Sequence, residues 1–341
     1  MKRWLPVFLL GAGLLAAGCA SFRNDGTPDW VTGKSARYPD TRYLIGRGQA
    51  ADADTARNRA RADLAQIFET SVKVEASDVT RFKSSGGEGG HGRAESEITR
   101  NIVTRTDQIV QGIQIAELWQ DPKTGAHHAL AVLPRQQAAA GLRQEIGRLD
   151  AATRSYVEQA RDTRDLLLRT AAADRALESQ AARDAIQKTL RVVDLTGRGV
   201  EPEFNSGRLA ADLDALLKRI QVRPRALSGD DPDLEAMLSG GLSAAGFAPA
   251  SAREASYVLA GSLKLDDMGL IQGWYWTRGL LEVRLTVVAS GRVRGTKRWE
   301  VKGSARDKAT ARRRALDEAD AILKRQLRST ILGFATGEQG R

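Results

Sequence analysis

Cys19 is the only cysteine of the 341-residue chain, and its position suggests the clearest chemistry in the sequence. It directly follows the small residues 16–18 (AAG), which end an uncharged apolar run over residues 4–17. Lys2 and Arg3 precede that run, so basic residues, an apolar segment and a small-residue cleavage site follow in the order of a secretory leader. A thiol at the first position after such a site can act as the nucleophile that takes up a lipid.

The segment Ala16-Ala17-Gly18-Cys19 resembles the lipobox of bacterial lipoproteins. We therefore expect residues 1–18 to be a signal peptide and Cys19 to become the lipidated N-terminus. The alternative is a plain leader with a chance cysteine. The apolar run of about fourteen residues is too short for a spanning helix. By resemblance the mature N-terminus carries three acyl chains, and two or more anchor stably. Because Ala20 and not Asp follows, resemblance to Gram-negative sorting predicts a cell outer membrane location, lipid-anchored and facing the periplasm.

The other candidate nucleophiles and metal ligands form no catalytic or metal-binding pattern. His127 and His128 are adjacent on an expected strand and would point to opposite faces, and His91 stands in a glycine-rich stretch. Residues 87–92 satisfy G-x-G-x-x-G, but the stretch is too rich in glycine for the tight turn of a dinucleotide site. We therefore expect a protein that is not an enzyme and has no cofactor and no metal. A hydrolase with carboxylates from distant segments stays open as an alternative.

An aromatic cluster near the C-terminal end is the second candidate site. Trp274, Tyr275, Trp276 and Arg278 lie between two glycines, which predicts an exposed loop between strands. Tryptophan, tyrosine and arginine are enriched at binding hot spots, and the aromatic residues also at membrane interfaces. The cluster could therefore bind glycan, lipid or a protein partner. The alternative is that the rings fold over the edge of a sheet.

Hydrophobic periodicity divides the chain into modules that would position these residues. Polar, turn-rich residues 19–28 suit a tether between the lipid and the first domain. We expect an α+β protein with two small α/β sandwich-like modules, in which helices lie on mainly antiparallel sheets, joined by a helical segment. The expected units are an α/β domain over 29–135, a helical connector over 136–219 and a C-terminal α/β domain over 220–335.

The first domain shows alternating and helical patterns in succession. Residues 43–49 predict a strand, residues 56–71 an amphipathic helix, and residues 113–133 a hairpin around the turn DPKTG. Between the helix and the hairpin, the sequence suggests a strand over 72–76, a glycine-rich excursion over 83–93, and an element over 95–111 that is either helical or extended.

Hydrophobic periodicity also predicts the elements of the connector and of the last domain. Apolar positions recur at three- and four-residue steps from Leu142 to Leu167, which indicates a helical hairpin or, alternatively, a longer coiled coil. A helix is expected over 205–219. The last domain shows strand patterns over 257–265, 280–289 and 297–302, with helices over 233–245 and 308–331.

Short motifs in the first domain resemble the Lpp-twenty lipoprotein family. They are Pro28-Asp29-Trp30, the strand YLIGRG ending at Gly48, the alanine-rich helix 56–68 and the hairpin 113–133. The resemblance implies an outer-membrane-associated lipoprotein, in some members part of a flagellar structure, and carries no catalytic residues. By element order alone, the C-terminal unit is vaguely similar to modules of flagellar assembly protein T, penicillin-binding-protein activators and the curli secretion lipoprotein.

Charge and export together limit the classes of partner. The net charge of +10 falls to +8 when Lys2 and Arg3 are removed with the leader. Export argues against nucleic acid, and leaves lipopolysaccharide, phospholipid head groups, peptidoglycan and envelope proteins as partners beside the membrane held through Cys19. A homo-oligomer is also compatible with the sequence. We expect a cell-envelope scaffold or adaptor, as part of a flagellar or other envelope assembly. The alternatives are a curli-type secretion-pore subunit and an envelope hydrolase.

Overall fold

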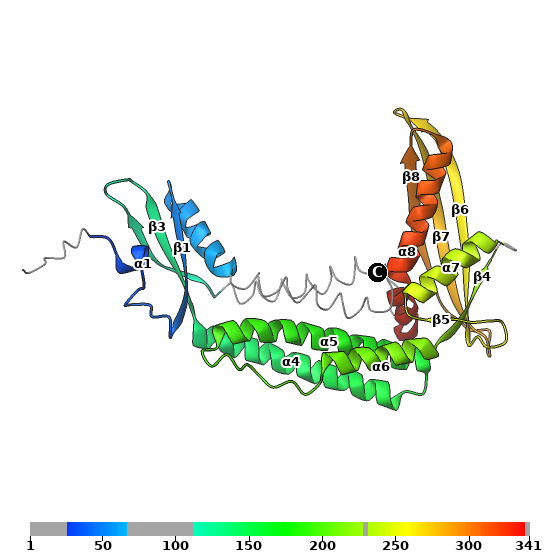
Figure 1. Ribbon diagram of the computed structural model, residues 1–341, viewed down its shortest axis with the longest axis horizontal. Helices are drawn as coiled ribbons and strands as arrows, with labels where there is room; N and C mark the ends of the chain where they lie inside the picture. Colours follow the sequence, from blue (N-terminus) through cyan, green and yellow to red (C-terminus); the bar gives the residue numbers. More distant parts are fainter. Residues whose placement is uncertain (1–25, 67–111, 228–230, 338–341) are drawn as a thin grey trace, which may run out of the picture.

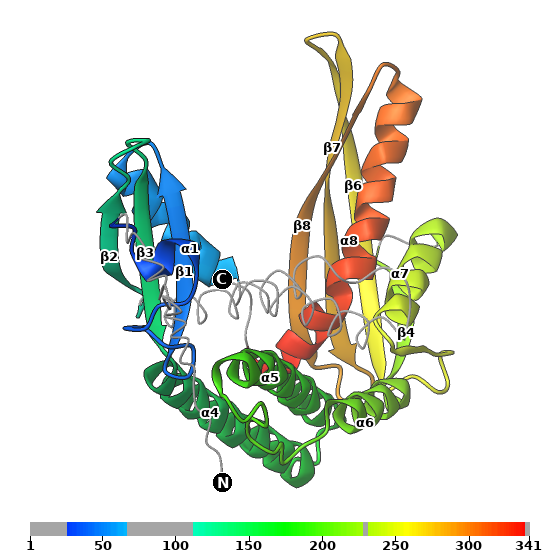
Figure 2. The same ribbon diagram turned by 60° about the vertical axis from the view of Figure 1, so that its left-hand side comes forward.

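The computed structural model describes residues 26–66, 112–227 and 231–337 (Figure 1). The leader, Cys19, most of the tether, the predicted strand 72–76, the glycine-rich excursion with His91 and the segment 95–111 lie outside these residues. The described residues form helices and two separate sheets, so the predicted α+β class is confirmed. The two sheets stand at opposite ends of a helical bar and extend from the same side of it (Figures 1 and 2).

The N-terminal module is a three-stranded antiparallel sheet in the order β1-β3-β2. The predicted first strand and the predicted hairpin are both confirmed. A helix over residues 53–66 follows the first strand directly. The labelled elements are α1 (Asp29–Thr32), β1 (Tyr43–Ala50), β2 (Gln114–Gln120) and β3 (His127–Pro134).

The two faces of this sheet are covered in different ways. Ala56, Ala60 and Leu64 form the buried stripe of the helix over 53–66, as the spacing predicts. On the opposite face Trp30 is buried, and its indole N–H donates to Glu117 at 2.7 Å. Arg47 donates to the carbonyl of Trp30 at 2.6 Å, so the segment containing α1 is held to β1.

The connector is a helical hairpin, which confirms that interpretation over a continuous coiled coil. It consists of α4 (Arg135–Asp162) and α5 (Leu166–Val193), followed by the shorter α6 (Ser206–Arg219). The break comes where Asp165 caps α5, with a carboxylate oxygen that accepts from the backbone amides of Leu167 at 2.9 Å and Leu168 at 3.2 Å.

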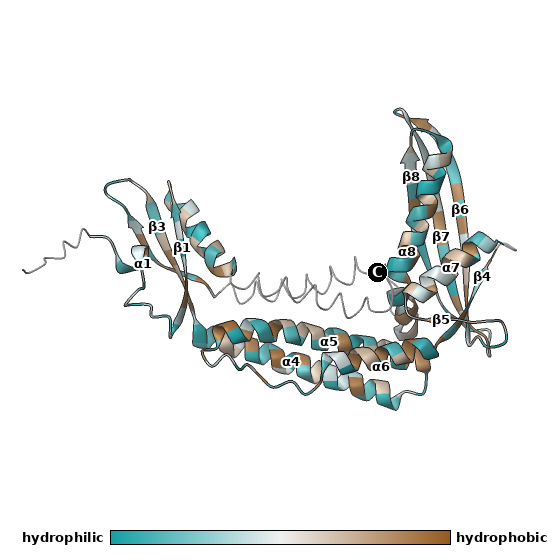
Figure 3. Cartoon of the chain, in the orientation of Figure 1, coloured by the Kyte–Doolittle hydropathy of each residue, from teal (hydrophilic) through white to brown (hydrophobic). Residues whose placement is uncertain are grey.

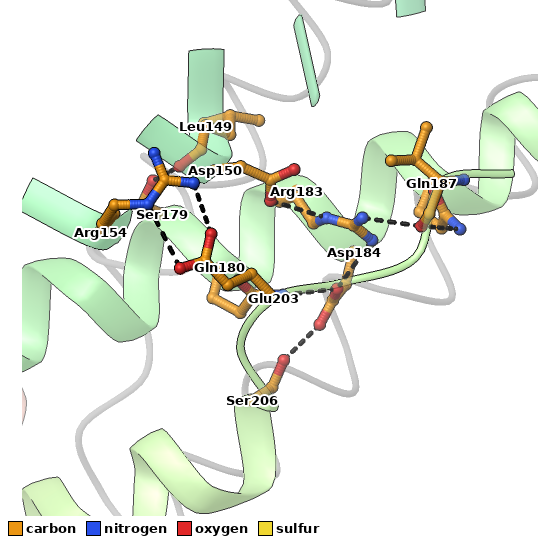
Figure 4. A network of polar contacts seen from close by, with 11 residues as sticks. Leu149, Asp150, Arg154, Ser179, Gln180, Arg183, Asp184, Gln187, Glu203 and Ser206 are labelled. Carbon is orange, nitrogen blue, oxygen red and sulfur yellow. Dashed lines mark hydrogen bonds and ion pairs between the residues drawn. The ribbon is translucent and has the colours of Figure 1, made fainter. Parts of the chain in front are cut away.

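A buried arginine ties the connector together (Figure 4). Arg183 of α5 is 1% exposed, and its Nε donates to Asp150 of α4 at 3.0 Å while its Nη2 donates to the carbonyl of Val200 at 2.8 Å. The side-chain amide of Gln187 also binds the backbone of Val200: it donates to the Val200 carbonyl at 2.8 Å and accepts from the Val200 amide at 3.1 Å. Helices α4 and α5 and the loop after them are thus held together by polar contacts.

The C-terminal module is a five-stranded sheet in the order β5-β4-β6-β7-β8, antiparallel except where β4 pairs with β5 and β6. Helix α8 packs on β7 and β8, and its buried residues include Ala311, Ala315 and Leu323. The elements are β4 (Gln221–Ala226), α7 (Pro232–Ala244), β5 (Ala248–Pro249), β6 (Tyr257–Ile271), β7 (Trp274–Val287), β8 (Val293–Ala305) and α8 (Lys308–Thr336).

The strands predicted over 257–265 and 280–289 are longer than expected, and residues 266–279 are not a loop between them. Both strands continue through these residues, so β6 and β7 form one long hairpin joined only by residues 272–273. The backbone pairing across the two strands satisfies the amides and carbonyls of this polar stretch, which is why a composition typical of a loop can lie in a sheet.

Each end of the connector is part of the hydrophobic core of one module. Ile146, Ile186 and Leu190 belong to the cluster around β1 and β3, whereas Leu167 and Leu217 belong to the cluster around β6, β7 and α8. Figure 3 shows hydrophobic and hydrophilic residues alternating along α4 and α5, as expected of helices with one buried face. The modules are therefore joined to the bar by packing as well as by the chain.

The two modules repeat one structural unit, which sequence reasoning missed. Gly48 of β1 and Gly303 of β8 lie in strands with the same alternating burial, and each is followed by a capped helix with at least three alanine or leucine positions at 0% exposure. The residues that match in type are Gly48 and Gly303, Ala50 and Ala305, Asp52 and Asp307, Thr55 and Thr310, Ala56 and Ala311, Arg57 and Arg312, Arg59 and Arg314, and Ala60 and Ala315.

The contacts of the two units match as closely as their residues. Asp52 accepts from the amide of Thr55 at 2.8 Å, and Asp307 accepts from the amide of Thr310 at 2.8 Å. Arg59 donates to the carbonyl before Ala50 at 2.6 Å, and Arg314 makes the equivalent bond to Ser304 at 2.6 Å. The sheet order β1-β3-β2 thus corresponds to β8-β7-β6, although the glycine strand comes first along the chain in one module and last in the other.

Within the described ranges, no helix combines the length and the apolar character that crossing a membrane requires.

Candidate functional site

The predicted aromatic cluster lies at the outer end of the β6–β7 hairpin, which projects beyond the rest of its module (Figure 2). Gln272 and Gly273 form the turn, with φ angles of 51° and 79°. A two-residue turn with both φ angles positive matches the twist of antiparallel strands, and glycine favours the second position. The expected exposed loop is therefore wrong, because Trp274, Tyr275 and Trp276 are the first residues of β7.

The outermost part of the hairpin has no third strand beside it. β8 ends at Ala305, which is level with Tyr275, so the residues nearer the turn pair only with one another. We call residues 268–274 the hairpin tip. Its large apolar side chains are exposed: Met268 by 47%, Leu270 by 60%, Ile271 by 47% and Trp274 by 38%.

Apolar side chains extend from both faces of the hairpin tip. Ile271 pairs directly with Trp274, and Leu270 pairs with Tyr275 one position further from the turn. Because side chains alternate along a strand, these two pairs lie on opposite faces. Trp276 and Arg278 share the face of Trp274, so the sequence-predicted residues divide, with Tyr275 alone on the side of α8.

Cations from the junction of β8 and α8 lie against the two aromatic rings nearest the turn. The guanidinium carbon of Arg306 is 4.6 Å from the ring centroid of Trp274, and Nζ of Lys308 is 5.8 Å from that of Tyr275. Lys308 also pairs with Asp267 at 3.1 Å. The backbone amide of Gly269, and secondly Lys308, hold the pKa of the Asp267 carboxyl below its usual range. This acid is therefore charged and paired at neutral pH.

Sequence reasoning found the aromatic half of this site and missed the rest. Met268, Leu270 and Ile271 were not predicted, because the polar residues before them suggested that the strand had ended. Arg306 and Lys308 approach the rings only through the pairing of β7 with β8. The sequence did contain one signal for this hairpin. It was the Gln272-Gly273 pair, which suits a two-residue turn, between two segments whose side chains can alternate as in strands.

The equivalent hairpin of the N-terminal module provides an internal comparison. β2 and β3 have seven and eight residues, whereas β6 and β7 have fifteen and fourteen. The turn after β2 is polar, and Asp121 accepts from Lys123 at 2.9 Å and from Thr124 at 2.6 Å. The short hairpin shows that this sheet and helix can pack without a long apolar extension, so the extension in the second module is a separate feature.

The other predicted candidates lie elsewhere or outside the described residues. Cys19, His91 and the glycine-rich motif over 87–92 are among the latter. His127 and His128 are adjacent on β3, and the ring of His128 lies 5.2 Å from that of Trp119 across the sheet. Within the described ranges, no three histidine, cysteine, aspartate or glutamate side chains form a group that could hold a metal ion.

Two glycines of β1 allow close approach of the backbone of the following helix. A Cβ atom on Gly46 would lie 2.4 Å from the carbonyl oxygen of Ala60, and one on Gly48 would lie 2.1 Å from that of Ala56. Both glycines therefore let the helix over 53–66 rest directly on β1. The two glycines therefore serve the packing of the N-terminal module, to which the family motifs belong.

Comparison with known proteins identifies the N-terminal module. The LPP20 lipoprotein family matches residues 28–134, about a third of the chain, which confirms the predicted resemblance. No curated protein sequence matches the chain. The match to a lipoprotein family supports a membrane-anchored protein of the cell envelope.

Several solved structures resemble parts of this chain, with low TM-scores. A Caulobacter crescentus chain described as a lipoprotein has 15% identity and a TM-score of 0.27, covering 38% of this chain and 98% of its own. A secreted protein from Helicobacter pylori has 11% identity and a TM-score of 0.37, covering 86% and 97%. A minor lipoprotein from Acinetobacter baumannii has 16% identity and a TM-score of 0.26, covering 36% and 94%. At these scores the similarities carry no argument about function.

Proposed function

We propose that the protein is a lipid-anchored scaffold or adaptor on the periplasmic face of the outer membrane, without catalytic activity of its own. In this proposal Cys19 carries the lipid, and the two modules contact different components of the envelope. The family match over residues 28–134 supports the lipoprotein part of the proposal.

The observation that carries the scaffold role is the fixed spacing of the two modules. The connector helices contribute to both cores, and their interior holds the satisfied network around Arg183. At the N-terminal end, Arg135 donates to the carbonyls of Val192 and Val193 at 3.0 Å each. At the other end, Arg328 of α8 pairs with Asp174 of α5 at 3.5 Å. A bar fixed at both ends suits a protein that holds two partners at a set distance.

The two modules also offer different surfaces. The N-terminal sheet has a polar turn and a single exposed leucine, Leu118 at 45%, among its large hydrophobic residues in the described part of the chain. The C-terminal module exposes the hairpin tip. Different exposed chemistry on two rigidly joined modules is what an adaptor requires, because each end must select its own partner.

Crosslinking in the native cell tests the proposal. A photo-crosslinking residue would replace Leu118 in one variant and Leu280, which is 38% exposed on β7, in another, with the 0% exposed Leu142 as the matched control position. We expect adducts with envelope components from both exposed positions and none from the buried one. A protein that stays monomeric and gives no envelope adduct from either module would contradict the scaffold role.

A Cys19→Ser variant separates anchoring from folding in the same experiment. We expect this variant to keep its thermal stability, because Cys19 precedes all described elements, but to be washed from the membrane fraction by high salt, which leaves the parent protein attached, and to lose its adducts after that wash. Unchanged membrane fractionation of the variant would contradict anchoring through this residue.

A further inference from the structure

We propose that the hairpin tip is a second membrane contact, which inserts into the interface of a bilayer that contains anionic phospholipid. The inference rests on the proposed function in one respect, since an anchored envelope protein is the setting in which such a bilayer is near. It assigns a ligand class to residues 268–274, which neither the family match nor the predicted scaffold role assigns.

The first argument is the distribution of apolar side chains. Leu270 and Ile271 are 60% and 47% exposed, and they lie on opposite faces of a two-stranded ribbon. A flat protein surface would cover only one of these faces. A bilayer surrounds an inserted tip on every side, so both faces lose water together. Exposed apolar residues gathered at one projecting end mark an interaction site.

The second argument is the position of the cations relative to the tip. Strand β8 runs toward the turn and Ala305 pairs with Tyr275, so Arg306 is level with Trp274, about 3–7 Å behind the turn at about 3.3 Å per residue. Amphipathic segments bury their apolar side about 5–10 Å deep in the interface. At the shallow end of that range Arg306 would be level with the phosphate groups, and Lys302, paired with Arg278, would lie further out in the same basic zone.

The third argument is the aromatic content at the same level. Trp274 and Tyr275 are the first two residues after the turn, and such amphipathic rings concentrate at the boundary of a bilayer with water. The guanidinium of Arg306 lies over the ring of Trp274, and so presents its charge beside that ring. Aromatic ring and cation therefore lie together at the level of the interface and head groups, beside the exposed apolar side chains of the tip.

The acidic residues near the tip do not oppose this arrangement. Asp267 is paired with Lys308 at 3.1 Å, so its charge is compensated within the protein. Asp266 is opposite Arg278 in the strand register. Asp307 accepts from the amide of Thr310 as the cap of α8. The cation nearest the turn, Arg306, lies over the indole ring of Trp274.

Vesicle binding by the unlipidated chain tests the inference. The chain from Ala20 onward keeps every described residue and lacks only the leader and Cys19. It would be sedimented with vesicles of phosphatidylethanolamine and phosphatidylglycerol, and separately with vesicles of phosphatidylcholine alone. We expect binding to the anionic vesicles that weakens with added salt, and weak binding to the neutral ones.

Two variants and a matched control locate the contact. Leu270→Ser combined with Ile271→Ser should weaken binding at least about tenfold, because two apolar side chains no longer leave water. Arg306→Gln should weaken it about fivefold on anionic vesicles only. Leu195→Ser, which alters a residue 63% exposed on the loop after α5, should leave binding unchanged. All variants should keep the unfolding temperature of the parent chain.

A depth measurement separates insertion from adsorption. Brominated lipid chains quench nearby tryptophan, so we expect quenching that Trp274→Phe largely removes. No vesicle binding, binding that the two tip substitutions leave unchanged, or a tip that binds an envelope protein but no vesicle would overturn the inference. The chain used carries no lipid, so these outcomes leave the proposed anchoring and scaffold role to be judged by crosslinking in cells.

Discussion

Replacing Gly303 by alanine should open the contact between β8 and α8. A Cβ atom at this position would lie 2.2 Å from the carbonyl oxygen of Ala311 and 2.6 Å from the amide nitrogen of Ala315. Both are backbone atoms of the helix, so no side-chain rotation relieves the clash. Helix α8 would have to move away by about 1 Å, since contacts of about 3.5 Å or more are ordinary.

The cost of this movement can be estimated from overpacked cores. Forcing an extra carbon into a close-packed site typically costs about 1–3 kcal/mol, and a clash with two backbone atoms of the helix belongs at the upper end. We expect the free energy of unfolding to fall by about 3 kcal/mol. This lowers the unfolding temperature by about 6–12 °C if the C-terminal module unfolds with the connector helices packed on it, as a unit of about 150–250 residues. Ala311 and Ala315 are both 0% exposed, so the same movement admits water along the buried stripe.

The chain supplies both a matched variant and a matched control. Gly48→Ala should cause the corresponding loss in the N-terminal module, because its Cβ would lie 2.1 Å from the carbonyl oxygen of Ala56. Gly141→Ala in α4 meets nothing within 4 Å and should stabilise by about 1 kcal/mol, since alanine favours a helix over glycine. Thermal unfolding gives the magnitudes, and hydrogen exchange shows which module is affected.

The reasoning is refuted if Gly303→Ala unfolds at the parent temperature with unchanged exchange in β8 and α8. It is also refuted if Gly303→Ala and Gly141→Ala behave alike, because the predicted difference comes only from the space around each position. A change in both modules from a single substitution would contradict the separate clusters that pack around the two sheets.

Three further predictions concern the caps and the connector. Asp307 has its carboxyl pKa lowered by the amide of Thr310, so the advantage of the wild type over Asp307→Ala in thermal unfolding should be complete above about pH 4, its unfolded pKa, and shrink as pH falls through the lower folded value. An advantage that grows on acidification would contradict this sign. Arg183→Met leaves Asp150 without its buried partner and should cost about 3 kcal/mol in urea unfolding. Arg154→Met, which breaks the exposed pair between α4 and Glu203 of the loop before α6, should change stability little.

The sequence was sufficient wherever one local pattern decided the structure. Alternation predicted the strand at 43–49 and the hairpin over 113–133, and three- and four-residue spacing predicted the buried stripe of Ala56, Ala60 and Leu64. These elements have a single buried face, so local hydrophobicity and tertiary packing agree.

The sequence was insufficient where distant strands decided the outcome. Asp266 and Gly269 are typical of a chain leaving a sheet, yet pairing with Arg278 and Trp276 keeps them in β6. Local propensity gives way there to cross-strand pairing. The position of the hairpin tip, and with it the exposed Leu270, could be known only once that pairing was fixed.

The repeated unit and the buried arginine were hidden for related reasons. The glycine strand and its helix precede their hairpin in one module and follow it in the other, so no constant period runs along the chain. Arg183 looks like one more charged residue on an amphipathic helix. Its burial depends on Asp150 and Val200, which belong to other segments.

Mass spectrometry of the protein purified from the envelope of its native cell tests the central claim most directly. We predict that proteolysis releases an N-terminal peptide that begins at Cys19 and carries the added mass of a lipid on that residue. A free thiol at Cys19, or a chain that still begins at Met1, would contradict the anchoring on which the proposed envelope role depends.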